Sequence, residues 1–187
     1  MSLQQDQHYI DQVIKGDINA FSVLVDRYKH MVYTLAVRMV RNNEEAEEVA
    51  QDTFLKVYKA LPSFKGDSKF STWVYKIAYN RSLDYVKKLS RMPETTLIEE
   101  YGEHNRTNLK TVLDQFEIDT RKETIKSAMQ ELPADYATIL TLHYFEELSL
   151  KEISKVMDAS PDTLKVKLFR ARKRLGGILK DRLQEKI

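Results

Sequence analysis

The 187-residue sequence contains no cysteine, only five glycines and four prolines, and no long hydrophobic run. The absence of cysteine excludes disulfides, cysteine-ligated zinc and thiol nucleophiles, and it is consistent with a reducing compartment. No apolar run approaches the ~18 residues of a transmembrane helix, so we expect no direct membrane insertion. The N-terminus lacks the basic-then-apolar layout of a secretory signal. The scarcity of glycine and proline indicates long helices with few tight turns.

The motifs of common enzyme classes are also missing. The four histidines, His8, His30, His104 and His143, are scattered and form no His-x-x-Glu or Glu-x-x-His pair. The sequence has no glycine-rich phosphate loop and no nucleophile elbow. A helical enzyme therefore has little support, and we expect no catalytic residue, no metal site and no cofactor.

Hydrophobic residues recur at helical spacing along most of the chain, which predicts an all-α fold. The first helix is expected to end near Gly16. A later helix is expected to begin with Asn43 as a candidate N-cap and to end at Pro62. The pattern dissolves between residues 93 and 121, apart from one candidate helical turn over 109–116, and resumes from residue 122. We therefore expect two small helical domains joined by a linker: residues 1–92, the linker 93–121 and residues 122–187.

Charge is distributed unevenly along the chain. Residues 64–91 hold seven Lys and Arg against two acids, residues 93–121 hold three against seven, and residues 160–187 hold nine against three. Two basic segments separated by an acidic linker are expected if two separate places meet a polyanion. Ordinary solvated helix faces would give the same counts, so charge alone leaves both interpretations open.

The stretch "FSTWVYKIAYN", residues 70–80, carries four aromatic residues. Helical spacing places one group on a core-facing side and leaves a second group on the opposite side. The first group is Phe70, Trp73, Val74 and Ile77, and the second is Thr72, Tyr75, Lys76 and Tyr79, with Asn80 at the edge. A core role explains the first group but not why two tyrosines and a lysine share the outward face, and exposed aromatics without a role are one alternative.

Residues 149–175 predict two helices joined by a tight turn. Ser149 and Glu152 fit a capping box at the start of the first helix. Asp158 ends that helix, because aspartate tolerates the left-handed conformation better than most residues. Ser160 can cap the second helix, and Pro161 suits its first turn.

The second of these helices has an apolar inner side and a cationic outer side. Leu164, Leu168, Ala171 and Leu175 are expected to face inward. The outer side holds Asp162, Lys165, Val166, Phe169 and Lys173, flanked by Arg170 and Arg172. A short helix-turn-helix with such a second helix suits the DNA major groove, where cations meet phosphates and guanine edges, and apolar groups meet thymine methyls. An αα-hairpin with merely solvated cations is the alternative.

Two blocks of the sequence together resemble a known family. "EEAEEVAQDTFLKVYKALPSFKGDSKFSTWVYKIAYNRSLDYV" resembles the promoter-melting domain, and "ELPADYATILTLHYFEELSLKEISKVMDASPDTLKVKLFRARKRL" the helix-turn-helix domain, of extracytoplasmic-function (ECF) sigma factors of bacterial RNA polymerase. The resemblance is close to end-to-end. It implies a cytoplasmic transcription initiation factor that binds core RNA polymerase, reads the −10 and −35 promoter elements and opens the −10 duplex. It also implies a cognate anti-sigma factor. A stand-alone transcription regulator, which would bind duplex DNA without polymerase, is the alternative.

The resemblance also implies roles for individual positions. Core polymerase contacts are expected at Glu48, Gln51, Asp52, Phe54, Val57, Tyr58 and Leu61. The −10 contacts are expected at Phe64, Lys65, Gly66, Asp67, Ser68, Lys69, Phe70, Ser71, Tyr75, Lys76, Tyr79 and Asn80, with Phe70 mainly holding the domain together and Asn80 reading a flipped base. The −35 contacts are expected within the helix-turn-helix Leu150 to Phe169 and just after it, at Thr163, Lys165, Val166, Lys167, Phe169, Arg170 and Lys173. Val166 departs from the serine common in relatives, so it cannot donate a hydrogen bond.

The linker length bears on how the domains meet DNA. The two promoter elements lie about 70 Å apart, two turns at ~34 Å each. A relaxed coil of 29 residues spans about 30 Å, and a stretched one about 95 Å. The domains can therefore reach both elements only when the linker is held extended. Away from polymerase we expect the two domains to close on each other and hide their DNA-binding faces.

Overall fold

The computed structural model describes residues 3–89 and 123–184, and within them it is helical without strands, as the periodicity predicts. The predicted linker 93–121 and its helical turn over 109–116 lie outside the described residues. The helices are α1 (Leu3–Ile14), α2 (Ile18–Val40), α3 (Asn43–Ala60), the short 3-10 helix η1 (Leu61–Ser63), α4 (Phe70–Leu89), a helix over residues 123–130, α6 (Ala134–Leu140), the π-helix η2 (Thr141–Phe145), α7 (Leu150–Met157) and α8 (Pro161–Gln184).

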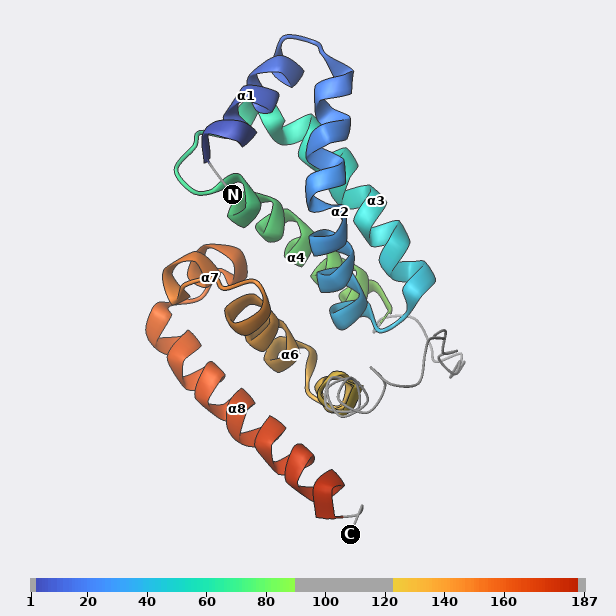
Figure 1. The fold of residues 1–187 in the computed structure, drawn as a ribbon, viewed down its shortest axis with the longest axis vertical. Helices are drawn as coiled ribbons and strands as arrows, with labels where there is room; N and C mark the ends of the chain where they lie inside the picture. The colour runs from blue at the N-terminus through green and yellow to red at the C-terminus, as the bar shows by residue number, and fades with distance from the viewer. Residues whose placement is uncertain (1–2, 90–122, 185–187) are drawn as a thin grey trace, which may run out of the picture.

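The first unit consists of α1 to α4 (Figure 1). α2, α3 and α4 pack against one another, and α1 packs on α2. Local sequence sets the helix ends: Asp17 caps α2 by accepting hydrogen bonds from the next turn, and Gly16 takes a positive φ of 101° between α1 and α2. The N-cap of α3 is Asn42, whose side chain accepts from the backbone N–H of Glu45. The expectation of Asn43 was therefore wrong by one residue.

A buried carboxylate holds α1 on α2. Asp6 is only 7% exposed; its carboxylate forms an ion pair with Arg27 and accepts a 2.6 Å hydrogen bond from the Tyr28 hydroxyl. The Arg27 guanidinium also lies over the ring of Tyr9, 5.4 Å from its centroid. Burial, with the neighbouring carboxylate of Asp6, raises the pKa of Tyr28, so its hydroxyl stays a donor.

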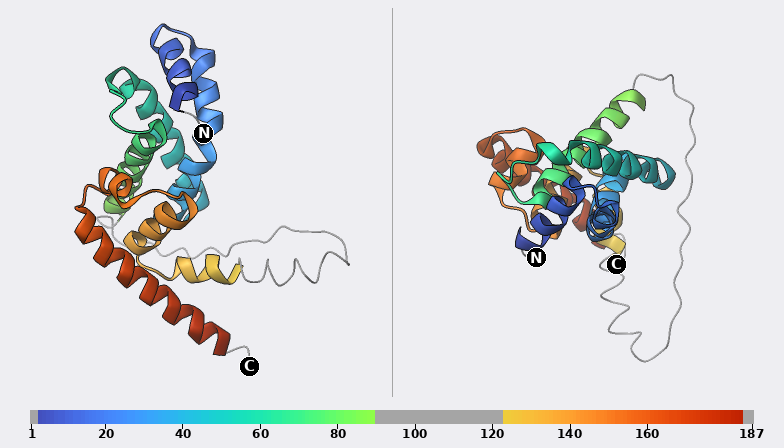
Figure 2. Two further views of the ribbon diagram at one scale, coloured as in Figure 1. Left: turned by 60° about the vertical axis from the view of Figure 1, so that its left-hand side comes forward. Right: turned by 90° about the horizontal axis from the view of Figure 1, so that it is seen from above.

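The second unit contains the helix over residues 123–130, α6, η2, α7 and the long α8. α6 and α7 both pack against α8. Figure 2 shows α8 extending beyond the rest of the molecule, with its C-terminal half far from the first unit. Leu164 and Ala171 are fully buried and Leu168 is 5% exposed, so the predicted inner side of α8 is confirmed for these three residues.

The two units contact each other. α4 packs on α7, α2 packs on α6, and one apolar cluster runs without a break from the first unit into the second. Both views in Figure 2 and the view in Figure 1 place α7 beside α4. We call this the closed arrangement. The expectation that the units close on each other agrees with it, but the extent to which the expected DNA-binding faces are hidden differs between the two units.

Candidate nucleic-acid interface

The loop before α4 is anchored by a cluster of aromatic rings. Phe70 is 2% exposed and lies within 5.6 Å, centroid to centroid, of the rings of Tyr28, Phe64 and Trp73. Phe64 also contacts Trp73 at 5.2 Å. The predicted core role of Phe70 therefore fits its burial. Because Phe64 and Phe70 are at either end of the loop, the rings fix both ends of the intervening polar segment.

The polar segment between these rings is largely exposed. Gly66 has a φ of 76°, which favours glycine, and a Cβ there would meet no other atom. Of the predicted −10 residues, the exposed ones are Lys65, Gly66, Asp67, Lys69 and Asn80, and the half-buried ones are Phe64, Ser68, Ser71 and Lys76.

The expectation that Tyr75 and Tyr79 lie on an outward face is wrong for the closed arrangement. Tyr75 is 2% exposed and Tyr79 is 7% exposed, and Thr72 on the same side is 1% exposed. Trp73 and Ile77, which were assigned to the core side, are half-buried. Helical spacing grouped these residues correctly, but the second unit lies against the side that the pattern left over, with Glu146 near Tyr75 and Asp135 near Tyr79.

Charged groups from both units surround Tyr75. Burial, together with the interaction of its hydroxyl with the carboxylate of Glu146, raises the pKa of Tyr75. Arg38 of α2 donates to the hydroxyl of Thr141 and lies 4.6 Å from the ring centroid of Phe145. Burial lowers the pKa of the Arg38 guanidinium, and the nearby carboxylate of Glu146 opposes that effect.

The loop of the first unit is paired with α7 of the second. The ammonium of Lys69 lies 2.9 Å from the carboxylate of Glu152, and the ammonium of Lys155 donates a 2.7 Å hydrogen bond to the carbonyl oxygen of Asp67. Hydrogen bonding to Lys69, with a further contribution from Ser149, lowers the pKa of Glu152 to about 2. Glu152 is therefore ionised at neutral pH.

The local geometry of the helix-turn-helix agrees with the sequence prediction. Ser149 and Glu152 form both hydrogen bonds of the capping box. Asp158 has a φ of 54°, in the left-handed region, and its carboxylate lies 3.6 Å from the ammonium of Lys76. The Ser160 hydroxyl accepts a 3.2 Å hydrogen bond from the backbone N–H of Thr163. The capping hydrogen bonds and the left-handed Asp158 fix the turn between α7 and α8. The outer side of α8 then faces solvent.

The outer side of α8 is open. Val166 is 50% exposed and Phe169 is 61% exposed, which leaves two large apolar side chains in water. The other exposed members of the predicted −35 set are Thr163, Lys165, Arg170 and Lys173. Lys167 differs, because its ammonium pairs with Asp135 of α6 at 2.7 Å and its side chain is 25% exposed. Lys167 is therefore half-buried, in contrast to the rest of that set.

The predicted polymerase-binding residues of α3 and η1 separate into two groups. Val57 and Leu61 are each 1% exposed and belong to the apolar core, so the expectation that they contact a partner is wrong for this structure. Glu48, Gln51 and Tyr58 are exposed, whereas Asp52 and Phe54 are half-buried. Asp52 forms an ion pair with Arg81 of α4, which links the two helices.

The sequence interpretation missed Leu55, which is 60% exposed beside the exposed polar residues of α3. A leucine one position outside the buried stripe of a helix is the pattern that could have indicated it. Together Glu48, Gln51, Leu55 and Tyr58 recur at helical spacing and form one exposed face of α3, which we call the α3 face.

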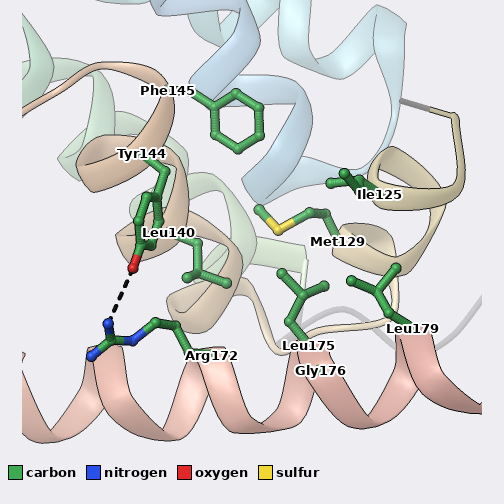
Figure 3. A pocket seen from close by; sticks show the side chains of 9 residues that line it. All are labelled: Ile125, Met129, Leu140, Tyr144, Phe145, Arg172, Leu175, Gly176 and Leu179. Atoms are coloured by element: carbon green, nitrogen blue, oxygen red, sulfur yellow. Dashed lines mark hydrogen bonds between the residues drawn. The ribbon is translucent and has the colours of Figure 1, made fainter. Parts of the chain in front are cut away.

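A second apolar surface lies in the second unit. A groove of about 350 Å³ is bounded by the helix over residues 123–130, by the end of α6 with η2, and by the middle of α8 (Figure 3). At one end Arg172 donates a 3.2 Å hydrogen bond to the Tyr144 hydroxyl. The lining residues are Ile125, Met129, Leu140, Tyr144, Phe145, Arg172, Leu175, Gly176 and Leu179. The sequence interpretation had placed Leu175 on the inner side and Arg172 beside the outer side of the helix, and it predicted no groove here.

The fold and the exposed side of α8 define a helix-turn-helix DNA-binding protein. Comparison with known proteins gives the family. The family model for Sigma-70 region 2 matches residues 24–92, and that for Sigma-70 region 4 matches residues 122–175. RNA polymerase sigma-H factor of Pseudomonas aeruginosa is 36% identical over 99% of both chains. ECF RNA polymerase sigma factor SigW of Bacillus subtilis is 36% identical over 92% of this chain and 95% of its own.

Solved structures give the same fold. The sigma factor RpoE of Bartonella quintana, crystallised with the anti-sigma factor NepR, has a TM-score of 0.69 at 22% identity over 87% of this chain and 98% of its own. CnrH, in complex with the cytosolic domain of CnrY, has a TM-score of 0.66 at 22% identity over 94% and 97%. At this identity the structural similarity supports the fold alone.

The chain therefore belongs to the ECF sigma factors of bacterial RNA polymerase. It is a transcription initiation factor that binds core RNA polymerase and directs it to specific promoters. No helix among the described residues is both long and apolar enough to cross a membrane.

Proposed function

We propose that this sigma factor divides promoter recognition between its two units, within the domain limits 1–92 and 122–187. The outer side of α8 reads the −35 element as duplex DNA, through Lys165, Val166, Phe169, Arg170 and Lys173. The observation that supports this role is the 50% and 61% exposure of Val166 and Phe169 among cations. Exposed apolar side chains suit thymine methyl groups, and the surrounding cations suit phosphates and guanine edges.

The first unit takes the −10 element. The polar loop over residues 65–69 and the exposed amide of Asn80 are the groups that accept the flipped base and its neighbours. Extruding a base costs a few kcal/mol and needs hydrogen-bonding groups held in place, and the ring cluster around Phe70 supports the loop that supplies these groups. In this role Phe70 supports the loop from the core.

The α3 face, Glu48, Gln51, Leu55 and Tyr58, docks on core polymerase. It combines two exposed apolar side chains, with Leu55 60% and Tyr58 41% exposed, and two polar ones on a rigid helix. Such a mixed surface resembles the composition of protein–protein interfaces. Val57 and Leu61, which the sequence analysis expected to contact polymerase, are buried and hold α3 in place.

The chain acts without catalysing a reaction, since polymerase supplies the chemistry, and it works in the cytoplasm with the polymerase and the chromosome. We also infer an anti-sigma partner. This inference is supported by two proteins of the same fold: RpoE, whose structure was solved with the anti-sigma factor NepR, and CnrH, whose structure was solved with the cytosolic domain of CnrY.

Run-off transcription with purified core polymerase over a pool of promoters tests the whole proposal. We expect transcripts only when the chain is added, and Asn80→Ala should impair opening of the −10 duplex with the fold intact. Asn43→Ala, which removes an exposed asparagine from α3, is the matched control. A chain that binds duplex DNA strongly on its own and yields no transcripts would instead be a stand-alone regulator. Normal opening by a folded Asn80→Ala variant would remove the reading role of that residue.

A further inference from the structure

A chain of contacts connects α1 to the loop over residues 65–69. Four aromatic rings anchor this loop, and we call them the ring cluster: Tyr28, Phe64, Phe70 and Trp73. Phe64 and Phe70 stand at the two ends of the loop, and their ring centroids are 5.3 Å apart. Tyr28 of α2 links the ring cluster to α1, because its hydroxyl donates a hydrogen bond to the carboxylate of Asp6.

Both oxygens of the Asp6 carboxylate are used. Oδ1 forms the ion pair with Arg27, and Oδ2 accepts the 2.6 Å hydrogen bond from Tyr28. The guanidinium of Arg27 is held in turn over the ring of Tyr9. The Asp6 side chain is only 10% exposed, and a hydrogen bond to a charged group is shorter and stronger than one between neutral groups. The contacts of Asp6 therefore fix the position of its carboxylate.

Packing of α1 does not by itself need a buried carboxylate. Ile10 and Val13 already bury one side of α1 in the core, at 1% and 8% exposure. A buried ion pair often stabilises a protein no better than apolar side chains of similar volume, because both charges lose their hydration. What the carboxylate adds is direction. It fixes the far end of the Tyr28 side chain, whose near end is fixed by the backbone of α2.

The orientation of the Tyr28 ring matters for Phe70. The two rings meet edge to face, with centroids 5.5 Å apart and planes at 68°, and aromatic pairs depend on such geometry because of the ring quadrupole. α1 also packs on η1, which ends one residue before Phe64. Figure 1 shows α1 and the loop before α4 at the same end of the first unit. α1 therefore supports both anchors of the loop.

We propose that Asp6 is a positioning residue for −10 recognition: through Tyr28 it fixes the place of Phe70, and with it the loop that accepts the flipped base. The proposal rests on the role of the loop given under the proposed function. Asp6 acts through other residues and is not placed in contact with DNA. Without the hydrogen bond to Tyr28, the ring cluster samples more than one arrangement, and a smaller fraction of molecules presents the loop correctly.

Tyr28→Phe isolates the orienting hydrogen bond, because it removes one oxygen and keeps both the ring and the ion pair between Asp6 and Arg27. Opening of the −10 duplex is measured in the complete holoenzyme, at a temperature where the variant is folded. If about a third to a tenth of the variant molecules present the loop correctly, opening falls about three- to tenfold.

Val49→Ala is the matched control for a loss of stability. Val49 is 4% exposed and belongs to a separate apolar cluster with Ala36 and Ala46, so its truncation destabilises the first unit without touching the ring cluster. At a temperature where this variant is folded, we expect opening of the −10 duplex to be unchanged.

Trp73 reports on the ring cluster directly, because it is the one tryptophan of the sequence. It is half-buried, and its ring lies 5.2 Å from Phe64 and 5.6 Å from Phe70. In the free full-length chain, Tyr28→Phe should shift the tryptophan emission or increase its quenching by acrylamide, and Val49→Ala should do neither. A hydrogen bond that only stabilised the fold would lower Tm and leave the emission of the folded chain unchanged.

A double variant tests whether Asp6 acts through Tyr28. Asp6→Ala combined with Tyr28→Phe should impair opening no more than Asp6→Ala alone, because both changes break the same link. Tyr28→Phe keeps the test decisive if Asp6→Ala does not fold. Additive losses in the double variant, normal opening by a folded Tyr28→Phe variant, or an unchanged Trp73 emission in that variant would overturn the proposal.

The emission measurement does not depend on promoter activity, so the two proposals can fail separately. If Asn80→Ala impairs opening and Tyr28→Phe does not, the positioning role is wrong and the proposed function stands. If Asn80→Ala opens promoters normally and Tyr28→Phe still shifts the Trp73 emission, the proposed −10 role is contradicted, and the link between α1 and the ring cluster stands.

Discussion

Replacing Phe70 with leucine separates a core role from a DNA-contact role for this ring. Phe70 is 2% exposed and contacts the rings of Tyr28, Phe64 and Trp73 at 5.5, 5.3 and 5.6 Å. Each aromatic pair is worth about 0.5–1.5 kcal/mol beyond the buried area. Since the three pairs share one ring and neighbouring terms are not additive, we expect a total near the lower half of the sum, about 1.5–3 kcal/mol.

The expected loss can be converted into a melting temperature. The 187-residue chain lies in the size class for which 1 kcal/mol corresponds to 2–4 °C, so about 3 °C per kcal/mol applies. Phe70→Leu should therefore lower Tm by about 5–9 °C, measured by calorimetry or circular dichroism at fixed protein concentration. Leu55→Ala is the control, because Leu55 is 60% exposed and its truncation should change Tm little.

A folded Phe70→Leu variant that melts within about 2 °C of the parent chain would refute the reasoning from ring contacts. If the same variant lost promoter opening, the ring would act on DNA directly and not through the loop it supports. If both Tm and opening fell together, and if opening recovered on cooling well below the melting range, the core role would be supported.

Three further changes have expected outcomes. Asp6→Asn should cost about 1–3 kcal/mol in the denaturant-derived free energy of unfolding, because it leaves the partly buried Arg27 without its carboxylate; no loss would mean that α1 is not held by this pair. The pKa of Glu152, lowered to about 2, means that its contribution is complete above about 4.5 and is lost as the pH falls toward 2. NMR titration should show the low midpoint, and Lys69→Ala should raise it; an unchanged midpoint would contradict the interdomain pair. Lys173→Ala should make the slope of log K against log salt for −35 duplex binding less negative by about 0.9, and an unchanged slope would place Lys173 away from the phosphates.

Short-range signals in the sequence determined the helix-turn-helix. The capping box at Ser149 and Glu152, the left-handed Asp158 and the inward Leu164 all form as predicted. These features depend on groups within a few residues of each other, so their geometry follows from local chemistry. The outer side of α8 follows in turn, because a helix with a fixed start and a fixed inner side has a fixed outer side.

The same local rules could not predict what covers a helix face. Helical spacing shows that Tyr75 and Tyr79 share one side of α4, but it does not show that this side is buried, with Glu146 near Tyr75 and Asp135 near Tyr79 in the second unit. Val57 was assigned to a partner by resemblance and is core, whereas the exposed Leu55 was missed. Burial depends on contacts between segments far apart in the sequence, and periodicity carries no information about them.

The sequence by itself therefore determined the all-helical composition, the helix ends, the cationic second helix and, through resemblance, the family. Only the tertiary structure decided that α7 lies on α4, that Arg38 reaches the second unit, and that the proposed −10 and −35 surfaces are covered unequally. The physical reason is that helix formation is governed by neighbours along the chain, whereas docking is governed by shape and charge complementarity between surfaces that the chain brings together only after folding.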